Sequence, residues 1–253
     1  MGTWPKNPVI YEINSWVWLH ELKHKYHRSV TLGSVPAEEW DALAATDAEV
    51  VWLMGVWERS PIGTRIARTL PVLQAEYRKA LPDYSLDDVV GSPYCVHRYV
   101  VEEQLGGPQG LAQARAELAS RGLRLILDFV PNHVATDHPW VYEFPKYFIQ
   151  GSGEDLVGVP NDFFVADGKI IACGRDPYFP PWTDTAQVNA FHPGLRRAVI
   201  DTLSSVAEEC DGIRCDMAML VISSIFERTW GDRAGPRPDS EYWREVIEAV
   251  RER

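Results

Sequence analysis

One stretch of the chain constrains its fold more than any other, the run Leu-Arg-Leu-Ile-Leu-Asp-Phe at residues 123–129. It is almost wholly apolar, and it follows a helical pattern at residues 108–120 that stops at Gly122. A strand with one face in water alternates apolar and polar residues, whereas a nearly unbroken apolar strand suits a parallel sheet covered on both faces. The sequence therefore predicts a buried parallel strand preceded by a helix.

The alternation of strand and helix patterns extends along the rest of the chain. Short apolar runs predict three more strands, at residues 9–13, 49–54 and 211–216. Helical patterns occupy residues 36–45, 192–209 and 241–253. This order implies a parallel α/β sheet with right-handed crossovers, either doubly wound or closed into a barrel. Because no glycine-rich nucleotide-binding sequence follows any strand, the pattern disfavours a nucleotide-binding fold.

Residues 134–190 interrupt this regular pattern. They are rich in Pro, Gly and aromatic residues, including the run Pro-Tyr-Phe-Pro-Pro-Trp that ends at Trp182. A structureless loop of this length is unusual inside a compact domain. We therefore expect a small inserted subdomain here, with residues 1–133 before it and residues 191–253 after it.

Composition excludes several classes of protein. The chain has 253 residues and a formal net charge of −11, which disfavours nucleic acid as a partner because phosphate binding relies on clustered Lys and Arg. It lacks a basic leader followed by an apolar run, and no stretch approaches 18 apolar residues, so we expect no membrane partner and a cytoplasmic location. The spacing of His20, His24 and His27 is too irregular for a metal site and indicates a solvated segment.

Two polar clusters follow predicted strands, where a parallel barrel places its active site. Asp128 to His133 reads Asp-Phe-Val-Pro-Asn-His, and Arg214 and Asp216 lie two residues apart, on one face of the fourth strand. A neighbouring guanidinium favours the ionised carboxylate that a nucleophile requires. The same spacing also fits an ordinary salt bridge at a strand end. For Asp128, Asn132 and His133 taken separately, the sequence favours loop capping and turn formation over catalysis.

These clusters resemble two signatures of the alpha-amylase family of glycoside hydrolases. The run ending at His133 is similar to the family's D-x-x-x-N-H at the end of the third barrel strand, and residues 211–220 are similar to its G-x-R-x-D at the end of the fourth. Residues 91–107 resemble the segment after the second strand. The resemblance implies a (β/α)8 TIM-barrel fold, of which this chain holds about the first four βα units, with a subdomain inserted after the third strand.

The resemblance also implies roles at the matching positions. Asp216 would be the nucleophile that forms a covalent glycosyl intermediate, and Arg214 would hold and polarise it. His133 would donate a hydrogen bond to the sugar and Tyr94 would stack on it, while Asp128 would pair with Arg214. Trp182 is a candidate for sugar stacking. Asn132 matches a position that ligates calcium in many members of the family.

Three departures from the family pattern limit what the resemblance implies about substrate and activity. Met219 and Leu220 stand where family amylases commonly carry Lys and His to grip the sugar beyond the cleaved bond. No clear version of the family's short acidic signature precedes the third helix; residues 184–189 occupy roughly that place. The family's general-acid Glu ends a fifth strand, which the pattern does not reach, so we expect the chain to be a fragment.

Two functions follow from these expectations. The first is a retaining alpha-glycoside hydrolase or transglycosylase that acts on an alpha-glucan or alpha-glucoside. The alternative is a catalytically inactive half-barrel that binds carbohydrate or a partner protein. Because a half-barrel leaves sheet edges that closure would remove, we also expect self-association through the open edge.

Overall fold

The computed structural model describes residues 4–252, which form two compact units. Among the described residues, the first unit comprises residues 4–58, Tyr99–Phe129 and Ser204–Arg214. The second comprises Arg59–Arg98, Val130–Leu203 and residues 215–252. Within the described part of the chain, no helix is long and apolar enough to cross a lipid bilayer.

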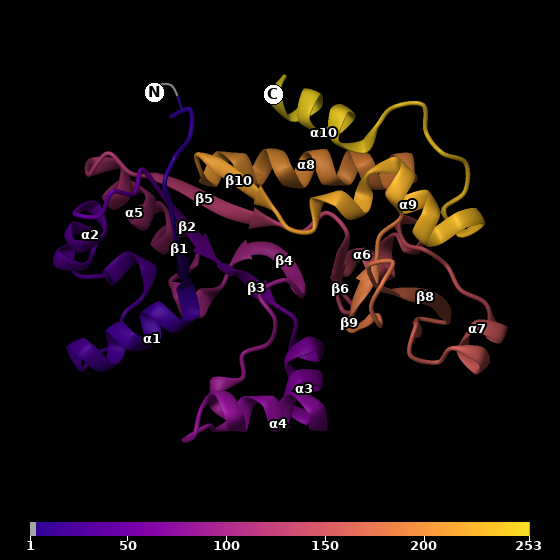
Figure 1. Cartoon of the computed structure of the whole chain (residues 1–253), viewed down its shortest axis with the longest axis horizontal. Helices are drawn as coiled ribbons and strands as arrows, with labels where there is room; N and C mark the ends of the chain where they lie inside the picture. Colours follow the sequence, from indigo (N-terminus) through magenta and orange to yellow (C-terminus); the bar gives the residue numbers. More distant parts are fainter. Residues whose placement is uncertain (1–3, 253) are drawn as a thin grey trace. The chain divides into compact units, whose positions relative to one another are not determined.

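A four-stranded sheet forms the centre of the first unit (Figure 1). Its strands, in spatial order, are β1 (Ile10–Asn14), β2 (Val50–Met54), β5 (Arg124–Phe129) and β10 (Gly212–Cys215). β1 runs parallel to β2, and β2 runs parallel to β5. Most side chains of the two inner strands are buried, and Val51 and Leu125, which are paired in register, are fully buried. This burial explains the nearly unbroken apolar run of β5.

Helices and short turns flank this sheet in the first unit. They are α1 (Ser15–Tyr26), η1 (Leu32–Ser34), α2 (Ala37–Ala44), η3 (Glu103–Leu105) and α5 (Gly107–Ser120). α5 ends just before Gly122, which has a φ of +79°, a backbone conformation that favours glycine. Its inner face buries Ala114 and Leu118 completely.

Hydrogen bonds of Arg115 and Asp211 hold the start of β10 beside β5. Arg115 of α5 donates to the main-chain oxygens of Glu208 and Cys210 and to Asp211 Oδ1, at 2.6 to 2.8 Å. Asp211 Oδ2 in turn accepts from the main-chain N–H of Leu125 at 2.9 Å. The register of β10 against β5 is thus fixed by charged hydrogen bonds as well as by the sheet.

An antiparallel sheet organises the second unit, in the order β6-β9-β8-β7. These strands are β6 (His133–Ala135), β9 (Trp182–Gln187), β8 (Lys169–Gly174) and β7 (Phe163–Ala166). β7 and β8 are joined by the two-residue turn Asp167-Gly168, and both residues have positive φ, as the twist of a tight hairpin favours. The Pro-rich and aromatic stretch of the sequence is therefore ordered structure.

The second unit also carries most of the helical elements among the described residues. Its helical elements are α3 (Pro61–Thr69), α4 (Pro71–Ala80), η2 (Leu86–Asp88), α6 (Pro139–Glu143), η4 (Pro145–Tyr147), α7 (Gly153–Gly158), η5 (Ala218–Val221), α9 (Ser223–Trp230), η6 (Gly231–Ala234) and α10 (Tyr242–Arg251). The helix α8 (Pro193–Glu209) contributes residues to both units, and β3 (Trp57–Arg59) pairs with β4 (Val96–Val101) in a two-stranded sheet.

The four predicted strands and the helices at 36–45, 108–120, 192–209 and 241–253 all match elements of the structure. The sequence did not predict α1, α3 or α4. Correspondingly, His20 and His24 are exposed as expected, but they lie on a helix, where a spacing of four residues is regular. The division of the chain at residues 133 and 190 stays a prediction.

Candidate active site

In the first unit, the structure brings Asp128 and Arg214 together. Asp128 lies on β5 and Arg214 on the adjacent strand β10, and Arg214 Nη1 lies 3.4 Å from Asp128 Oδ1. The other carboxylate oxygen of Asp128 accepts from the main-chain N–H of Gly55 at 3.3 Å. Asp128 is 2% exposed, and a carboxylate buried without hydrogen-bond donors would be costly, so these contacts stabilise it in its place.

Two tryptophans complete the surroundings of this ion pair. The Arg214 guanidinium lies 4.8 Å from the ring centroid of Trp52, within the range of a cation–π contact. Trp57 is fully buried, and its Nε1 donates to the main-chain oxygen of Asp128 at 2.7 Å. Both tryptophans therefore pack beside the Arg214–Asp128 ion pair. The contact with Trp52 helps to position the Arg214 guanidinium at the end of β10.

In the second unit, a buried amide network surrounds His133 at the start of β6. Asn132 and Gln187 are both buried, and Gln187 Nε2 donates to the main-chain oxygen and to Oδ1 of Asn132 at 2.9 and 3.1 Å. His133 is paired in register with Gln187 across β6 and β9. The conformation of the Asn132-His133 turn is thus fixed by the neighbouring strand. Gln187 is a site residue that the sequence analysis missed.

His133 also contacts the two aromatic residues that the sequence singled out. The ring centroids of His133 and Trp182 are 5.0 Å apart, and a hydrogen bond links the His133 side chain to the backbone of Tyr94. Tyr94 and Trp182 are both partly exposed, whereas His133 is buried. Four of the predicted substrate or metal residues, Tyr94, Asn132, His133 and Trp182, therefore form one cluster.

Asp216 belongs to the second unit and follows the last residue of β10. It is 8% exposed, and the next residue, Met217, has a φ of +49°, a left-handed conformation that is uncommon outside glycine. The chain thus turns sharply after Asp216 and enters η5. Met219 is half exposed and Leu220 is buried, so the side chains that replace the family's Lys and His differ in their access to solvent.

The contacts of Asn132 bear on the calcium that its position suggests. Besides Gln187, its amide nitrogen contacts His133 Nδ1 and the main-chain oxygen of Arg175, each at 3.4 Å. Calcium is held by several oxygen ligands that usually include carboxylates. Asn132 Oδ1 already accepts from Gln187 Nε2, and the described residues include no group of three or more His, Cys, Asp or Glu side chains that could hold a metal. The described surroundings of Asn132 therefore do not fit a calcium site.

Burial sets the protonation of two histidines in the second unit. It lowers the pKa of His133 from 6.5 to about 4, with partial opposition from the hydrogen bond to Tyr94. It lowers the pKa of His138 to about 3, with a further contribution from His97. Both imidazoles are therefore neutral at physiological pH, so each offers one N–H donor and one acceptor nitrogen.

These pKa values predict a loss of stability in mild acid. The unfolded chain binds protons on both histidines near pH 6.5, whereas the folded chain resists protonation until about pH 4. Stability is complete above pH 6.5 and falls below it, by about 2 kcal/mol per histidine at pH 5. Denaturant unfolding at pH 7.5, 6 and 5 measures the effect. In His133→Gln, the fall in unfolding free energy between pH 7.5 and 5 should be about half of that in the wild type. An unfolding free energy that stays constant from pH 7.5 to 5 would contradict the burial of neutral imidazoles.

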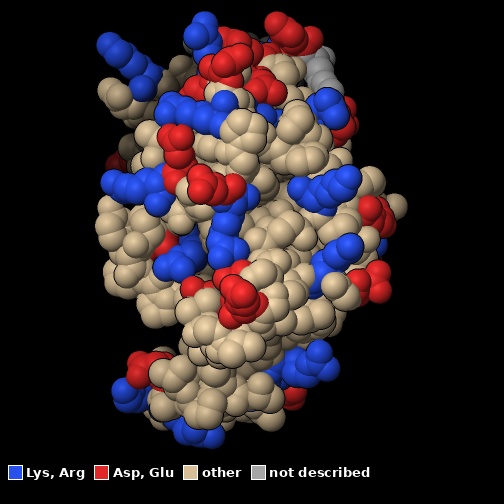
Figure 2. All heavy atoms as spheres, turned by 90° about the vertical axis from the view of Figure 1, so that its right-hand side faces the viewer, with Lys and Arg blue, Asp and Glu red and all other residues tan. Residues whose placement is uncertain are grey.

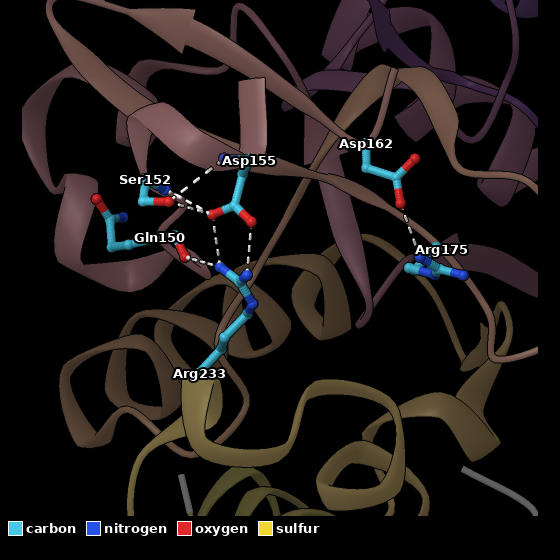
Figure 3. Close-up of polar contacts among 6 residues, drawn as sticks. All are labelled: Gln150, Ser152, Asp155, Asp162, Arg175 and Arg233. Carbon is cyan, nitrogen blue, oxygen red and sulfur yellow. Dashed lines mark hydrogen bonds and ion pairs between the residues drawn. The ribbon is translucent and has the colours of Figure 1, made fainter. Parts of the chain in front are cut away.

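A separate pocket of about 200 Å³ in the second unit is lined in part by two arginines. Figure 3 shows the ion pairs that these arginines make. Arg233, from η6, donates to Asp155 Oδ1 and Oδ2 at 2.7 and 3.0 Å, and the arginine lowers the pKa of Asp155 to about 2. Arg175 donates to Asp162 at 3.0 Å. Each arginine in the pocket is paired with a carboxylate, so one pair joins η6 to α7 and the other joins the residue after β8 to the residue before β7. We assign the pocket no ligand.

Basic and acidic side chains are interspersed on the face of the molecule drawn in Figure 2.

Comparisons with known proteins bear on the fold. No protein-family model matches the chain. The crystal structure of the trehalose-6-phosphate hydrolase TreA from Bacillus licheniformis aligns with 98% of the chain at a TM-score of 0.63 and 16% identity. A crystal structure of an alpha-amylase from Lactobacillus plantarum aligns with 88% of it at a TM-score of 0.56 and 17% identity. The chain therefore shares the fold of these alpha-amylase and trehalose-6-phosphate hydrolase structures.

The sequence comparisons agree with this alpha-amylase fold. The alpha-amylase MalA of Haloarcula japonica is 23% identical over 218 residues, 86% of the chain. A protein named as a maltooligosyl trehalose synthase from Mycobacterium tuberculosis is 35% identical over 75 residues. The chain spans 26% of the first relative and 10% of the second by these alignments, and 43% of TreA. The parallel α/β sheet is confirmed as part of a TIM-barrel-like domain.

Proposed function

We propose that this chain supplies the nucleophile half of a retaining alpha-glycosidase or transglycosylase. The observation that carries the proposal is the ion pair between Arg214 and Asp128. It joins one residue from each of the two signature motifs across the adjacent strands β5 and β10. An ordinary loop cap would not require two motifs 86 residues apart in sequence to meet at a buried carboxylate.

In the proposed reaction, a carboxylate oxygen of Asp216 attacks the anomeric carbon of an alpha-glucosidic bond. The bond from that carbon to the leaving oxygen breaks, and a glycosyl ester on Asp216 forms. Water or a sugar hydroxyl then attacks the ester and regenerates the carboxylate. Arg214, two residues before Asp216 and held by Asp128, supplies positive charge and fixes the backbone that presents the nucleophile.

The leaving oxygen needs a proton from a second carboxylic acid about 5 to 5.5 Å from the nucleophile. In the alpha-amylase family this acid is a Glu at the end of the fifth barrel strand. Residues 4–252 contribute four strands to the parallel sheet, ending with β10. We therefore propose that the chain comprises about the first four βα units of the barrel, with the antiparallel region as an inserted subdomain, and that the acid lies outside the described residues.

The substrate side of the proposal uses the cluster in the second unit. A neutral His133 can donate a hydrogen bond to a sugar hydroxyl, and the partly exposed rings of Tyr94 and Trp182 offer faces for stacking. The relatives named above are a trehalose-6-phosphate hydrolase, two alpha-amylases and a maltooligosyl trehalose synthase. The proposed substrate class is accordingly an alpha-glucan or alpha-glucoside, with water or a second sugar as acceptor.

The outer strand β1 favours self-association as a second property. In the described sheet β1 has a neighbour on one side, β2. Ile10 and Tyr11 on this strand, and Val9 before it, are 45 to 54% exposed. An apolar edge strand is a template for pairing with another strand, so we propose that β1 pairs with a strand of another domain or of a second copy.

Turnover of an alpha-linked aryl glucoside by the full-length protein distinguishes an enzyme from an inactive sugar-binding half-barrel. We expect saturable release of the aryl group with the anomeric configuration of the first product retained, as NMR of the product can show. Binding of an alpha-glucan without any turnover would favour the inactive alternative. Inversion of configuration would contradict a glycosyl ester on Asp216.

A further inference from the structure

The first long helix carries a histidine motif that the proposed glycoside chemistry does not use. Residues 20–24 read His-Glu-Leu-Lys-His, and they lie within α1 (Ser15–Tyr26). On a helix, residues four apart lie on the same face, one turn above the other. Leu19 and Leu22 of α1 are buried, whereas His20 and His24 are exposed. The two imidazoles are therefore presented together to solvent.

The distance between the two rings suits a shared metal ion. His20 Nε2 and His24 Nε2 lie 3.0 Å apart, and the ring centroids are 4.5 Å apart at an interplanar angle of 59°. Imidazole nitrogens bind zinc at about 2.0 to 2.1 Å, so two ligands on one ion are about 2.9 Å apart at a right angle and about 3.3 Å apart in a tetrahedron. We propose that His20 and His24 chelate a divalent transition metal ion of the zinc and copper class.

The electrostatics of the helix end contribute to the site. His24 lies in the last turn of α1, where the carbonyl ends of the helix carry partial negative charge that favours a cation. Lys23 and Lys25 flank His24 and oppose this effect. However, Lys25 Nζ is bound to Glu39 Oε1 at 2.5 Å, so its charge is paired.

The chemistry of the site follows from its ligand count. Among the residues that the structure describes, no group of three or more His, Cys, Asp or Glu side chains could hold a metal. The protein therefore supplies two nitrogens, and water or a small anion fills the remaining positions. A catalytic zinc site has three protein ligands, so we assign this one to exchangeable binding and not to hydrolysis.

Isothermal titration calorimetry of the full-length protein with Zn²⁺ tests this assignment. We expect His20→Ala and His24→Ala each to weaken one binding event by about tenfold or more, because the second nitrogen binds within the same molecule. The matched control is the double substitution His24→Lys with Lys25→His, which keeps the composition of α1 but places the histidines five residues apart, on different faces. It should bind Zn²⁺ as weakly as the single variants.

Electron paramagnetic resonance with Cu²⁺ gives an independent measurement on the unaltered protein. Coupling to two nitrogen ligands is expected in the wild type and should be reduced in His20→Ala. The proposal is overturned if the double substitution binds Zn²⁺ as tightly as the wild type, or if His20→Ala changes neither the calorimetric nor the Cu²⁺ signal. These readouts do not depend on glycoside turnover, so they stand apart from the proposed function.

Discussion

We expect replacement of Asp216 by Asn to lower kcat/KM of the full-length protein for an alpha-linked aryl glucoside by about 10⁴-fold or more, if the proposed function holds. The amide keeps the size and most of the polar contacts of the side chain, but it cannot form the glycosyl ester. Asp216 is nearly buried after β10, but the substitution is isosteric, so it should leave the fold intact. Steady-state kinetics measure the loss, and denaturant unfolding checks the fold.

A matched control for Asp216→Asn is Asp239→Asn, the same chemical change at an exposed position of the second unit. It should retain the wild-type kcat/KM within about twofold, because surface substitutions away from a site have small effects. If Asp216→Asn keeps the activity of the control, then Asp216 is not the nucleophile.

Replacing Arg196 by Met lowers the free energy of unfolding by about 3 to 5 kcal/mol. Arg196 lies on α8 and is 2% exposed. Its guanidinium donates to the main-chain oxygens of Ala190 and Ser240 and to Glu245 Oε2, at 2.5 to 2.9 Å. It also lies 5.6 Å from the ring centroid of the buried Tyr242. The substitution removes all of these contacts and leaves the acceptors to find other donors.

The neighbouring residue supplies the control for this stability experiment. Arg197 is exposed, so Arg197→Met removes an arginine from the same helix with no buried partner set. Its unfolding free energy should stay within about 0.5 kcal/mol of the wild type. An equal loss of unfolding free energy in both variants would contradict this account, because it would show that the contacts of Arg196 with α10 do not set the stability.

An element can be predicted from the sequence where its residue pattern is compatible with only one kind of structure. The apolar run of β5 has its side chains buried in the sheet, and Gly122 ends the preceding helix with a positive φ. The pairing of Asp128 with Arg214 was likewise predictable, because both residues follow apolar runs on strands expected to be neighbours. In each case the local pattern and the long-range fold agree.

Elements whose pattern lacks a strong apolar face were missed. α1 buries three residues, Ser15, Leu19 and Leu22, and it ends at His27 in the left-handed conformation, where glycine is the usual stop signal. α4 buries none of its side chains. Helices of this kind depend on their place in the fold, and their sequences do not specify them alone.

The network around His133 was beyond local reasoning for a different reason. Gln187 holds Asn132 across a separation of 55 residues, through the antiparallel register of β6 and β9. The connection between β6 and β9 contains two other strands and several helical turns. No rule of sequence spacing predicts which positions on two such strands are paired. The signature motif located His133, but only the structure shows the residue that fixes its turn.

Covalent trapping at Asp216 tests the proposed chemistry most directly. A fluorinated alpha-glucosyl fluoride slows breakdown of a glycosyl ester, so the ester accumulates and peptide mass spectrometry can locate it. We predict one sugar label per protein, on the peptide that contains Asp216, and no label in Asp216→Asn. A label on a different carboxylate, or turnover of the reagent by a protein that never becomes labelled, would contradict the assignment.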